Sequence, residues 1–161
     1  MSGKNDPVAL VQNPALGASL VWKFCRGFQA EKLGELTPMP SLFLVLPILL
    51  HESTLDEVRS TNLPSGLGKV VSKLANERER LLAVHDRALR LRDLTLQSIA
   101  MGVAANLLHL DYRSALIRAN EVVAPSLPER LKIRFACAEK LGRWFARMPQ
   151  GQVFTLLQVA I

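Results

Sequence analysis

Apolar residues form an unbroken run from Leu42 to Leu50, a stretch without charged or hydrogen-bonding side chains. A segment that is apolar on every side has no face for water, so we expect it in the middle of the core. The run is shorter than the roughly 20 apolar residues with which a helix crosses a bilayer. Pro47 disfavours a central strand because proline cannot donate to the ladder. The pattern predicts a short helix with Ser41 as its N-cap and His51 as its last residue, bent at Pro47.

A second apolar pattern precedes this run, with four large residues spaced every fourth position along one ridge of a helix. They are Leu16, Leu20, Phe24 and Phe28. Asn13 followed by Pro14 is a typical helix start, because asparagine is a good N-cap and proline loses least at the first helical position. We expect this helix to end near residue 29 and a loop to follow over residues 32–37. Gly17 within it predicts a close contact with another helix.

Helical spacing of apolar residues returns in most of the remaining chain, interrupted where Gly, Pro, Asn or Asp favours a break. The segments expected to be helical are 53–59, 67–74, 76–92, 95–103, 131–148 and 151–160, with a strand as the alternative for the last. Either Ser53 or Thr54 would cap the first of these helices. Either Asp93 or Thr95 would cap the fourth.

Two short apolar runs flank the polar segment from Asp111 to Ser114, a pattern that predicts a β-hairpin over residues 107–119. Several helices that lead into a hairpin follow the element order of a winged-helix domain. We therefore expect a mainly α protein with a small β-hairpin, in the form of a winged-helix-like single domain. This domain would span residues 13–161, behind a flexible N-terminal lead over residues 1–12.

The composition predicts a folded protein with a basic surface. Hydrophobic residues make up 49% of the chain, and Lys and Arg outnumber Asp and Glu by 20 to 14, which is a net charge of +6. Such a charge favours a polyanionic or acidic partner. The N-terminus lacks the apolar region of a secretion signal and no run reaches membrane-spanning length, so we expect a cytoplasmic protein without a membrane partner. Cys25 and Cys137 lie in apolar contexts and are expected to be buried free thiols.

No pattern typical of an active site is present in the sequence. His51, His85 and His109 are the only histidines, and none stands at metal-ligand spacing from another histidine or a cysteine. The chain contains neither a glycine-rich phosphate-binding motif nor a nucleophile elbow. Its carboxylates are scattered beside Arg or Lys. We therefore expect no catalytic residue, no cofactor and no metal site, and a protein that is not an enzyme.

Basic residues are concentrated in residues 69–92, where seven Lys or Arg residues accompany three acidic ones. A basic helix next to a hairpin is a candidate surface for the phosphates of DNA. The candidate contacts are Arg78, Arg87, Arg90 and Arg92 in this segment and Arg113 and Arg118 on the hairpin. The alternative is a solvated helix with local ion pairs, for example between Arg78 and Glu79 or between Asp86 and Arg90.

Trp144 stands apart from the apolar stripe of its helix, which passes through Phe135 and Phe145. Tryptophan is enriched at the centres of protein interfaces, so Trp144 is a candidate contact for a partner or for self-association as a homo-oligomer. The alternative is burial within its own chain, which we expect for Trp22 and Phe24.

Several short stretches of the sequence, taken in order, resemble one protein family. They are Asn13-Pro-Ala-Leu-Gly17 with Val21-Trp-Lys-Phe24, Pro40-Ser-Leu-Phe-Leu-Val-Leu-Pro47, Asp86-Arg-Ala-Leu-Arg90 leading into Leu94-Thr-Leu96, and Ala138-Glu-Lys-Leu-Gly142 with Trp144-Phe145. In this order they resemble the small middle component of bacterial three-component ABC systems, over most of the chain.

The resemblance implies a non-enzymatic accessory subunit that works with an SMC-like or RecF-like ABC ATPase and a third, variable component. It also implies a role in defence against phages or other mobile elements, and it carries no catalytic residue over to this chain. A winged-helix-type DNA-binding protein that acts through the basic helix and the hairpin is the alternative hypothesis. The two roles are compatible in one protein.

Overall fold

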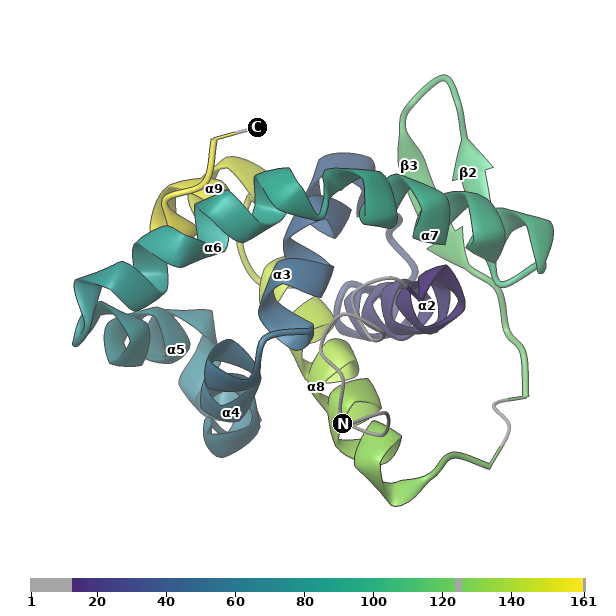
Figure 1. The fold of residues 1–161 in the computed structure, drawn as a ribbon. Coiled ribbons are helices and arrows are strands. Elements are labelled where there is room, and N and C mark those ends of the chain that lie inside the picture. The colour runs from purple at the N-terminus through teal and green to yellow at the C-terminus, as the bar shows by residue number, and fades with distance from the viewer. Residues whose placement is uncertain (1–12, 124–125, 161) are drawn as a thin grey trace.

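The computed structural model describes residues 13–123 and 126–160, so the lead expected over residues 1–12 lies outside the described residues. Within them the protein is mainly helical with a small three-stranded antiparallel sheet, which confirms the predicted fold class (Figure 1). The helices are α2 (Pro14–Glu31), η2 (Met39–Leu44), α3 (Val45–Leu49), α4 (Glu52–Ser60), η3 (Leu63–Ser65), α5 (Gly66–Ala75), α6 (Arg78–Arg90), α7 (Arg92–Ala104), α8 (Glu129–Ala146) and α9 (Gln150–Leu157). The strands are β1 (Thr37–Pro38), β2 (Leu108–Asp111) and β3 (Leu116–Ala119).

The apolar run lies in the core, as predicted, but it does not form one bent helix. It forms the 3-10 helix η2 and then α3, and Leu42 and Leu46 are both completely buried. The change of geometry at Leu44 places Pro47 in the first turn of α3, where a helix needs no N–H donor. The predicted cap is also wrong, because Ser41 lies buried inside η2, which begins without a side-chain cap.

Side chains from three other helices bind the carbonyl groups at the end of α3, which lies in the middle of these helices in Figure 1. The last carbonyls of a helix have no partner within it, so buried ones need a partner elsewhere. The three hydrogen bonds are Arg87 Nε to Pro47 O (3.0 Å), Thr54 Oγ1 to Ile48 O (2.6 Å) and Arg134 Nε to Leu49 O (3.2 Å). They fasten α6, α4 and α8 to the central helix.

The two helices of 18 residues, α2 and α8, pack against each other, and α2 also packs against α7. α2 begins as predicted, because the side chain of Asn13 accepts two backbone N–H bonds of the first turn. Gly17 makes the predicted close contact, since a Cβ there would collide with Ser98 of α7. Phe24 of α2 meets Phe145 of α8 edge to face, with ring centroids 5.1 Å apart. These contacts form the centre of the core.

The predicted caps of α4 are wrong, although the helix itself is confirmed. His51 has an extended backbone and precedes α4 as its N-cap, rather than ending α3. Ser53 and Thr54 lie inside α4, where their hydroxyl groups serve tertiary contacts. The hydroxyl of Ser53 accepts a hydrogen bond from Nε of Arg80 at 2.8 Å, and Thr54 donates to α3.

The break predicted near Asn76 is confirmed between α5 and α6, and the next break lies at Leu91, ahead of the predicted residues 93–95. Asp93 falls in the first turn of α7, where a negative charge is favoured by the helix dipole. Thr95 is completely buried, and its Oγ1 has no hydrogen-bond partner among the described residues. Neither residue therefore caps α7.

The predicted hairpin is confirmed as β2 and β3. The predicted loop over residues 32–37 is wrong at its end, because Thr37 and Pro38 form β1. This strand pairs antiparallel with β3 and gives the order β1-β3-β2. Two residues are too few to show the alternation by which a strand is recognised. The sheet order is compatible with a winged-helix domain, which stays a prediction.

The C-terminal segment forms α9, so the strand alternative for residues 151–160 is wrong. Both cysteines are free and buried, as expected. Over residues 13–123 and 126–160, no helix combines the length and the apolar character needed to cross a membrane.

Candidate functional site

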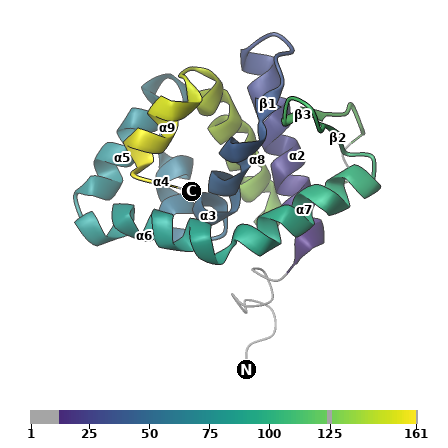
Figure 2. The same ribbon diagram turned by 90° about the horizontal axis from the view of Figure 1, so that it is seen from above.

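Helix α6 has three sides with different surroundings. Figure 2 shows α6 and α7 following one another along one edge of the protein. Leu81, Val84 and Ala88 are buried and hold α6 to the core. The other two sides of α6 are open, one to a basic pocket and one to solvent.

The basic pocket lies between α3, α4 and α6 and has a volume of about 700 Å³. Its apolar wall comes mainly from Leu46, Pro47 and Leu50, whereas α6 contributes mostly charged residues. The α6 residues are Glu79, Arg80, Ala83, Arg87 and Arg90. Arg80, Ala83, Arg87 and Arg90 are spaced by three or four positions, which puts them on one side of the helix. The sequence analysis named two of these arginines as DNA contacts but did not indicate a pocket.

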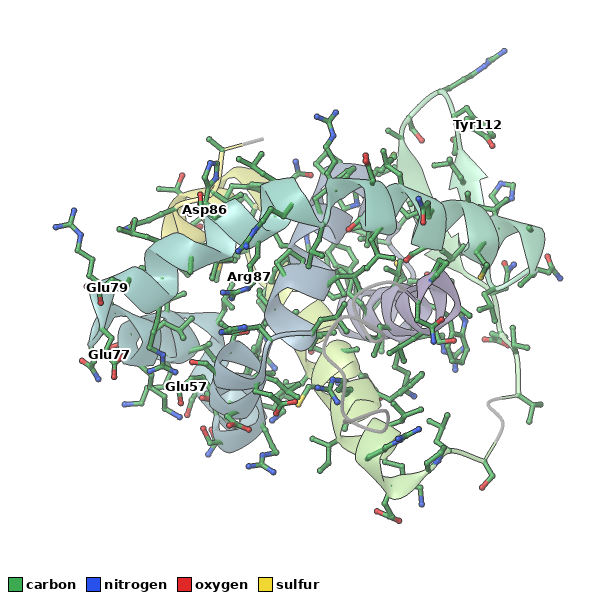
Figure 3. All side chains as sticks on the ribbon, in the orientation of Figure 1. Glu57, Glu77, Glu79, Asp86, Arg87 and Tyr112 are labelled. Atoms are coloured by element: carbon green, nitrogen blue, oxygen red, sulfur yellow. The ribbon has the colours of Figure 1, made fainter. Side chains whose placement is uncertain are left out.

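The guanidinium group of Arg87 is only partly satisfied. Its Nε donates to Pro47 O at 3.0 Å, but its buried Nη2 has no hydrogen-bond partner among the described residues. Burial and then the charge of Arg90 lower the pKa of Arg87. Figure 3 shows Arg87 on the side of α6 that faces α3, whereas Asp86 lies on another side. No carboxylate in the described part of the chain forms a salt bridge with Arg87.

Arg80 is neutralised at the same pocket. Its Nη2 lies 2.9 Å from Oε2 of Glu57 on α4, and its Nε donates to Ser53. His51 stands at the pocket as well, and its pKa is lowered from 6.5, first by desolvation and next by the charge of Arg87. The pocket therefore repels additional positive charge.

Three leucines on α6 and α7 are partly exposed to solvent. Leu82, Leu89 and Leu96 are 44%, 50% and 40% exposed. Leu82 and Leu89 are seven positions apart within α6 and therefore lie on nearly the same side of it, with a drift of about 20°. Leu96 lies in α7, beyond the break at Leu91. Leu89 also borders a groove of about 400 Å³, together with Phe43 of η2 and Arg92 of α7. We call these three leucines the leucine line.

The arginines predicted to contact DNA lie on α6, on α7 and on the hairpin, in different surroundings. Arg78, Arg90, Arg92, Arg113 and Arg118 are exposed, whereas Arg87 is half-buried in the basic pocket. Arg90 lines the same pocket and Arg92 lines the groove beside Leu89. The predicted local ion pairs are also not formed, neither between Arg78 and Glu79 nor between Asp86 and Arg90.

Trp144 belongs to the core rather than to an exposed interface. Its side chain is 0% exposed, and its Nε1 donates to Leu63 O at 2.9 Å. This is the alternative that the sequence left open, and Trp22 and Phe24 are buried as expected. The prediction that Trp144 is an exposed contact for a partner is therefore wrong.

The remaining histidines occupy two different places. Nδ1 of His85 accepts a hydrogen bond from the backbone of Ala160 at 3.2 Å, and His109 lies exposed on β2. In the described part of the chain, no group of three or more His, Cys, Asp or Glu residues could hold a metal ion.

The chain thus folds into a small, mainly helical protein. Its surface carries a basic pocket and three partly exposed leucines, which are the two candidate binding surfaces. The chain belongs to the family of the ABC-three component (ABC-3C) system Middle Component 3, whose model matches residues 1–161. The family resemblance seen in the sequence is thereby confirmed. No curated protein and no solved structure matches the chain.

Proposed function

We propose that this middle component is a non-enzymatic adaptor that docks on the ABC ATPase of its system through the leucine line. Family membership supports an accessory subunit in a multi-component ABC system. The proposal adds three points to family membership. The ATPase is the direct partner, a third component takes part in the system, and the system acts in defence against phages or mobile elements.

The exposed leucine line is the observation that carries the proposal. Its three side chains are 40–50% exposed, and the helices α6 and α7 that carry them follow one another along one edge of the protein (Figure 2). An exposed apolar strip bordered by charged residues is typical of a protein-binding surface. Arg78 and Arg92, and also the exposed carboxylates of Asp86 and Asp93, lie three or four positions from these leucines. A partner surface that combines apolar residues with charges of both signs would therefore complement the strip.

Co-expression of the tagged chain with the ATPase and the third component of its system tests this docking surface. The substitutions Leu82→Glu and Leu89→Glu place charges on the strip, and we expect both to abolish recovery of the ATPase. Leu33→Glu is the matched control, because Leu33 is 95% exposed in a turn outside the strip. Recovery of the ATPase with the strip variants at the level of the Leu33→Glu control would contradict the proposal.

DNA binding is the second candidate function, and it is favoured by the exposed hairpin. Arg113 and Tyr112 in the turn and Arg118 on β3 are all exposed, with Tyr112 83% exposed. A fluorescent duplex at roughly 50 mM salt tests it, since phosphate contacts are strongest at low salt. We expect the double substitution of Arg113 and Arg118 by Gln to weaken binding, whereas Arg130→Gln at the start of α8 should not. A duplex that stays unbound at this salt concentration rules the candidate out.

A further inference from the structure

We propose that the basic pocket binds a small organic anion. Its carboxylate or phosphate group would bond to Arg87 and Arg90, and its apolar body would lie against Leu46 and Leu50. The inference goes beyond the adaptor function and is independent of it, because the leucine line lies on a different side of α6.

The geometry of Arg87 is the first support. Its side chain is fixed, because Nε is bonded to Pro47 O at the end of α3, 3.0 Å away. A guanidinium group held in this way presents its remaining N–H groups in a planar fork that matches two oxygens of a carboxylate or a phosphate. The Nη2 atom lacks a partner in the described part of the chain, and a buried donor without one is costly. Because Nη2 is itself closed to solvent, an anion in the pocket would bond first to Nη1 of Arg87, and a small shift of the guanidinium group would let Nη2 share the same anion.

The distribution of charge at the pocket is the second support. Among the described residues, Glu57 forms a salt bridge with Arg80, whereas the other two arginines of the pocket, Arg87 and Arg90, form none. Glu79 is the carboxylate that lines the pocket, but it stands eight positions before Arg87, about 12 Å away along the helix axis. Figure 3 shows Glu79 near the start of α6 and Arg87 farther along it. The end of the pocket at Arg87 and Arg90 is therefore the end that attracts an anion.

The size and the wall of the pocket define the rest of the ligand. A volume of about 700 Å³ lies within the range of roughly 300–1,000 Å³ that is usual for small-molecule sites. Leu46, Pro47, Leu50 and Leu91 provide apolar wall next to the arginines. A bare inorganic ion would leave this wall uncovered, so an anion with an apolar body fits better.

Calorimetry and NMR titration of the full chain with four probes test the inference. The probes are phenyl phosphate, phenylacetate, inorganic phosphate and benzyl alcohol. We expect at least one of the two organic anions to bind with a Kd of about 1 mM or below, a value reasonable for a ligand of this size. Inorganic phosphate and the neutral alcohol should bind at least about tenfold more weakly. The stronger of the two organic probes then identifies the anionic group as phosphate or carboxylate.

Variants of α6 locate the site. Arg87→Gln should weaken binding by at least about tenfold, whereas Arg78→Gln, with the same change of charge outside the pocket, should leave it unchanged. Ala83→Leu keeps every charge but fills part of the pocket, so it should also weaken binding. This variant tests the site even if the Arg87→Gln variant does not fold. In the parent protein, an anion beside Arg87 should raise the pKa of His51, followed through its imidazole resonances.

Three results would overturn the inference. The first is a Kd above about 10 mM for both organic anions, which is too weak for a site of this size. The second is equal binding by the Arg87→Gln and Arg78→Gln variants. The third is full binding by Ala83→Leu. Loss of ATPase recovery by the leucine-line variants would leave the inference untouched, so the two proposals fail separately.

Discussion

Gly142 of α8 packs directly against the backbone of Phe24 on α2, so that a Cβ at Gly142 would collide with the carbonyl oxygen of Phe24. Gly27 has the reciprocal contact, because a Cβ there would collide with the carbonyl oxygen of Glu139. Two glycines thus allow α2 and α8 to approach more closely than side chains would permit. This close approach brings Phe24 and Phe145 into their edge-to-face contact.

The substitution Gly142→Ala should destabilise the protein. The atoms that a new methyl group would meet belong to the backbone of α2 and cannot rotate away, so the two helices must separate. We expect the free energy of unfolding to fall by about 1–3 kcal/mol or more, measured by urea denaturation. Gly68→Ala is the control, because Gly68 lies in α5 with open space around it and should gain up to about 1 kcal/mol. Equal stability of the two variants would contradict the close packing.

The substitution Trp144→Ala should destabilise the chain as a core substitution does. Its side chain is 0% exposed, and removal of a buried tryptophan costs about 3–5 kcal/mol. Trp144→Phe is the control and should lose less, because it keeps an aromatic ring, and Leu63 O keeps its bond from Arg147 Nη1 at 2.8 Å. Thermal unfolding of both variants at several protein concentrations measures the effect. An unchanged melting temperature for Trp144→Ala would restore the interface interpretation.

The burial of the central run could be predicted from the sequence because it follows from the composition of one segment. The interpretation of Trp144 failed for a different reason. A single apolar stripe predicts one buried face, but α8 packs against α2 and also against α4 and α5. A helix in the middle of a domain buries more than one face, and the neighbours that cover the second face cannot be recognised from the helix itself.

The basic pocket was missed because its parts are distant in the sequence. Arg87 looks like a surface residue of a charged helix, and its partner Pro47 lies 40 positions earlier. The spacing of Arg80, Ala83, Arg87 and Arg90 indicates that they share a side of α6. Nothing in the sequence indicates that this side faces the end of α3. Tertiary packing, rather than local pattern, therefore creates the candidate site.

Both thiols should be unreactive in the folded protein. Burial raises the pKa of Cys25 to about 12 and also raises the pKa of Cys137. The thiolate is the reactive form, so a disulfide reagent at about pH 8 should label neither residue quickly. In urea both cysteines should react, and a Cys25→Ala variant should then show one reactive thiol instead of two. Rapid labelling of the folded protein at the rate found in urea would show that the thiols are accessible.

The pH dependence of stability should report on His51. Its pKa in the folded protein lies below the usual 6.5, first because of desolvation and next because of the charge of Arg87. The charges of Arg80 and Arg90 lower the pKa further, whereas the carboxylate of Glu52 opposes the shift. Below pH 6.5 the unfolded chain then binds the proton more tightly than the folded protein does, so acid favours unfolding. The contribution of His51 to stability should increase as the pH rises through the folded pKa and level off above 6.5.

Urea denaturation from about pH 5 to about pH 7.5 measures this dependence, since histidine is the side chain that usually titrates there. The substitution His51→Gln should flatten the stability curve between the lowered pKa of His51 and 6.5. His109→Gln is the matched control, because it removes an exposed histidine on β2 and should leave this contribution in place. If the His51→Gln variant kept the slope of the parent protein, the pKa of His51 would not be lowered by its surroundings in the folded protein. The difference between the two variants, rather than the slope of either alone, therefore isolates the contribution of the lowered pKa of His51, to which both desolvation and the charge of Arg87 contribute.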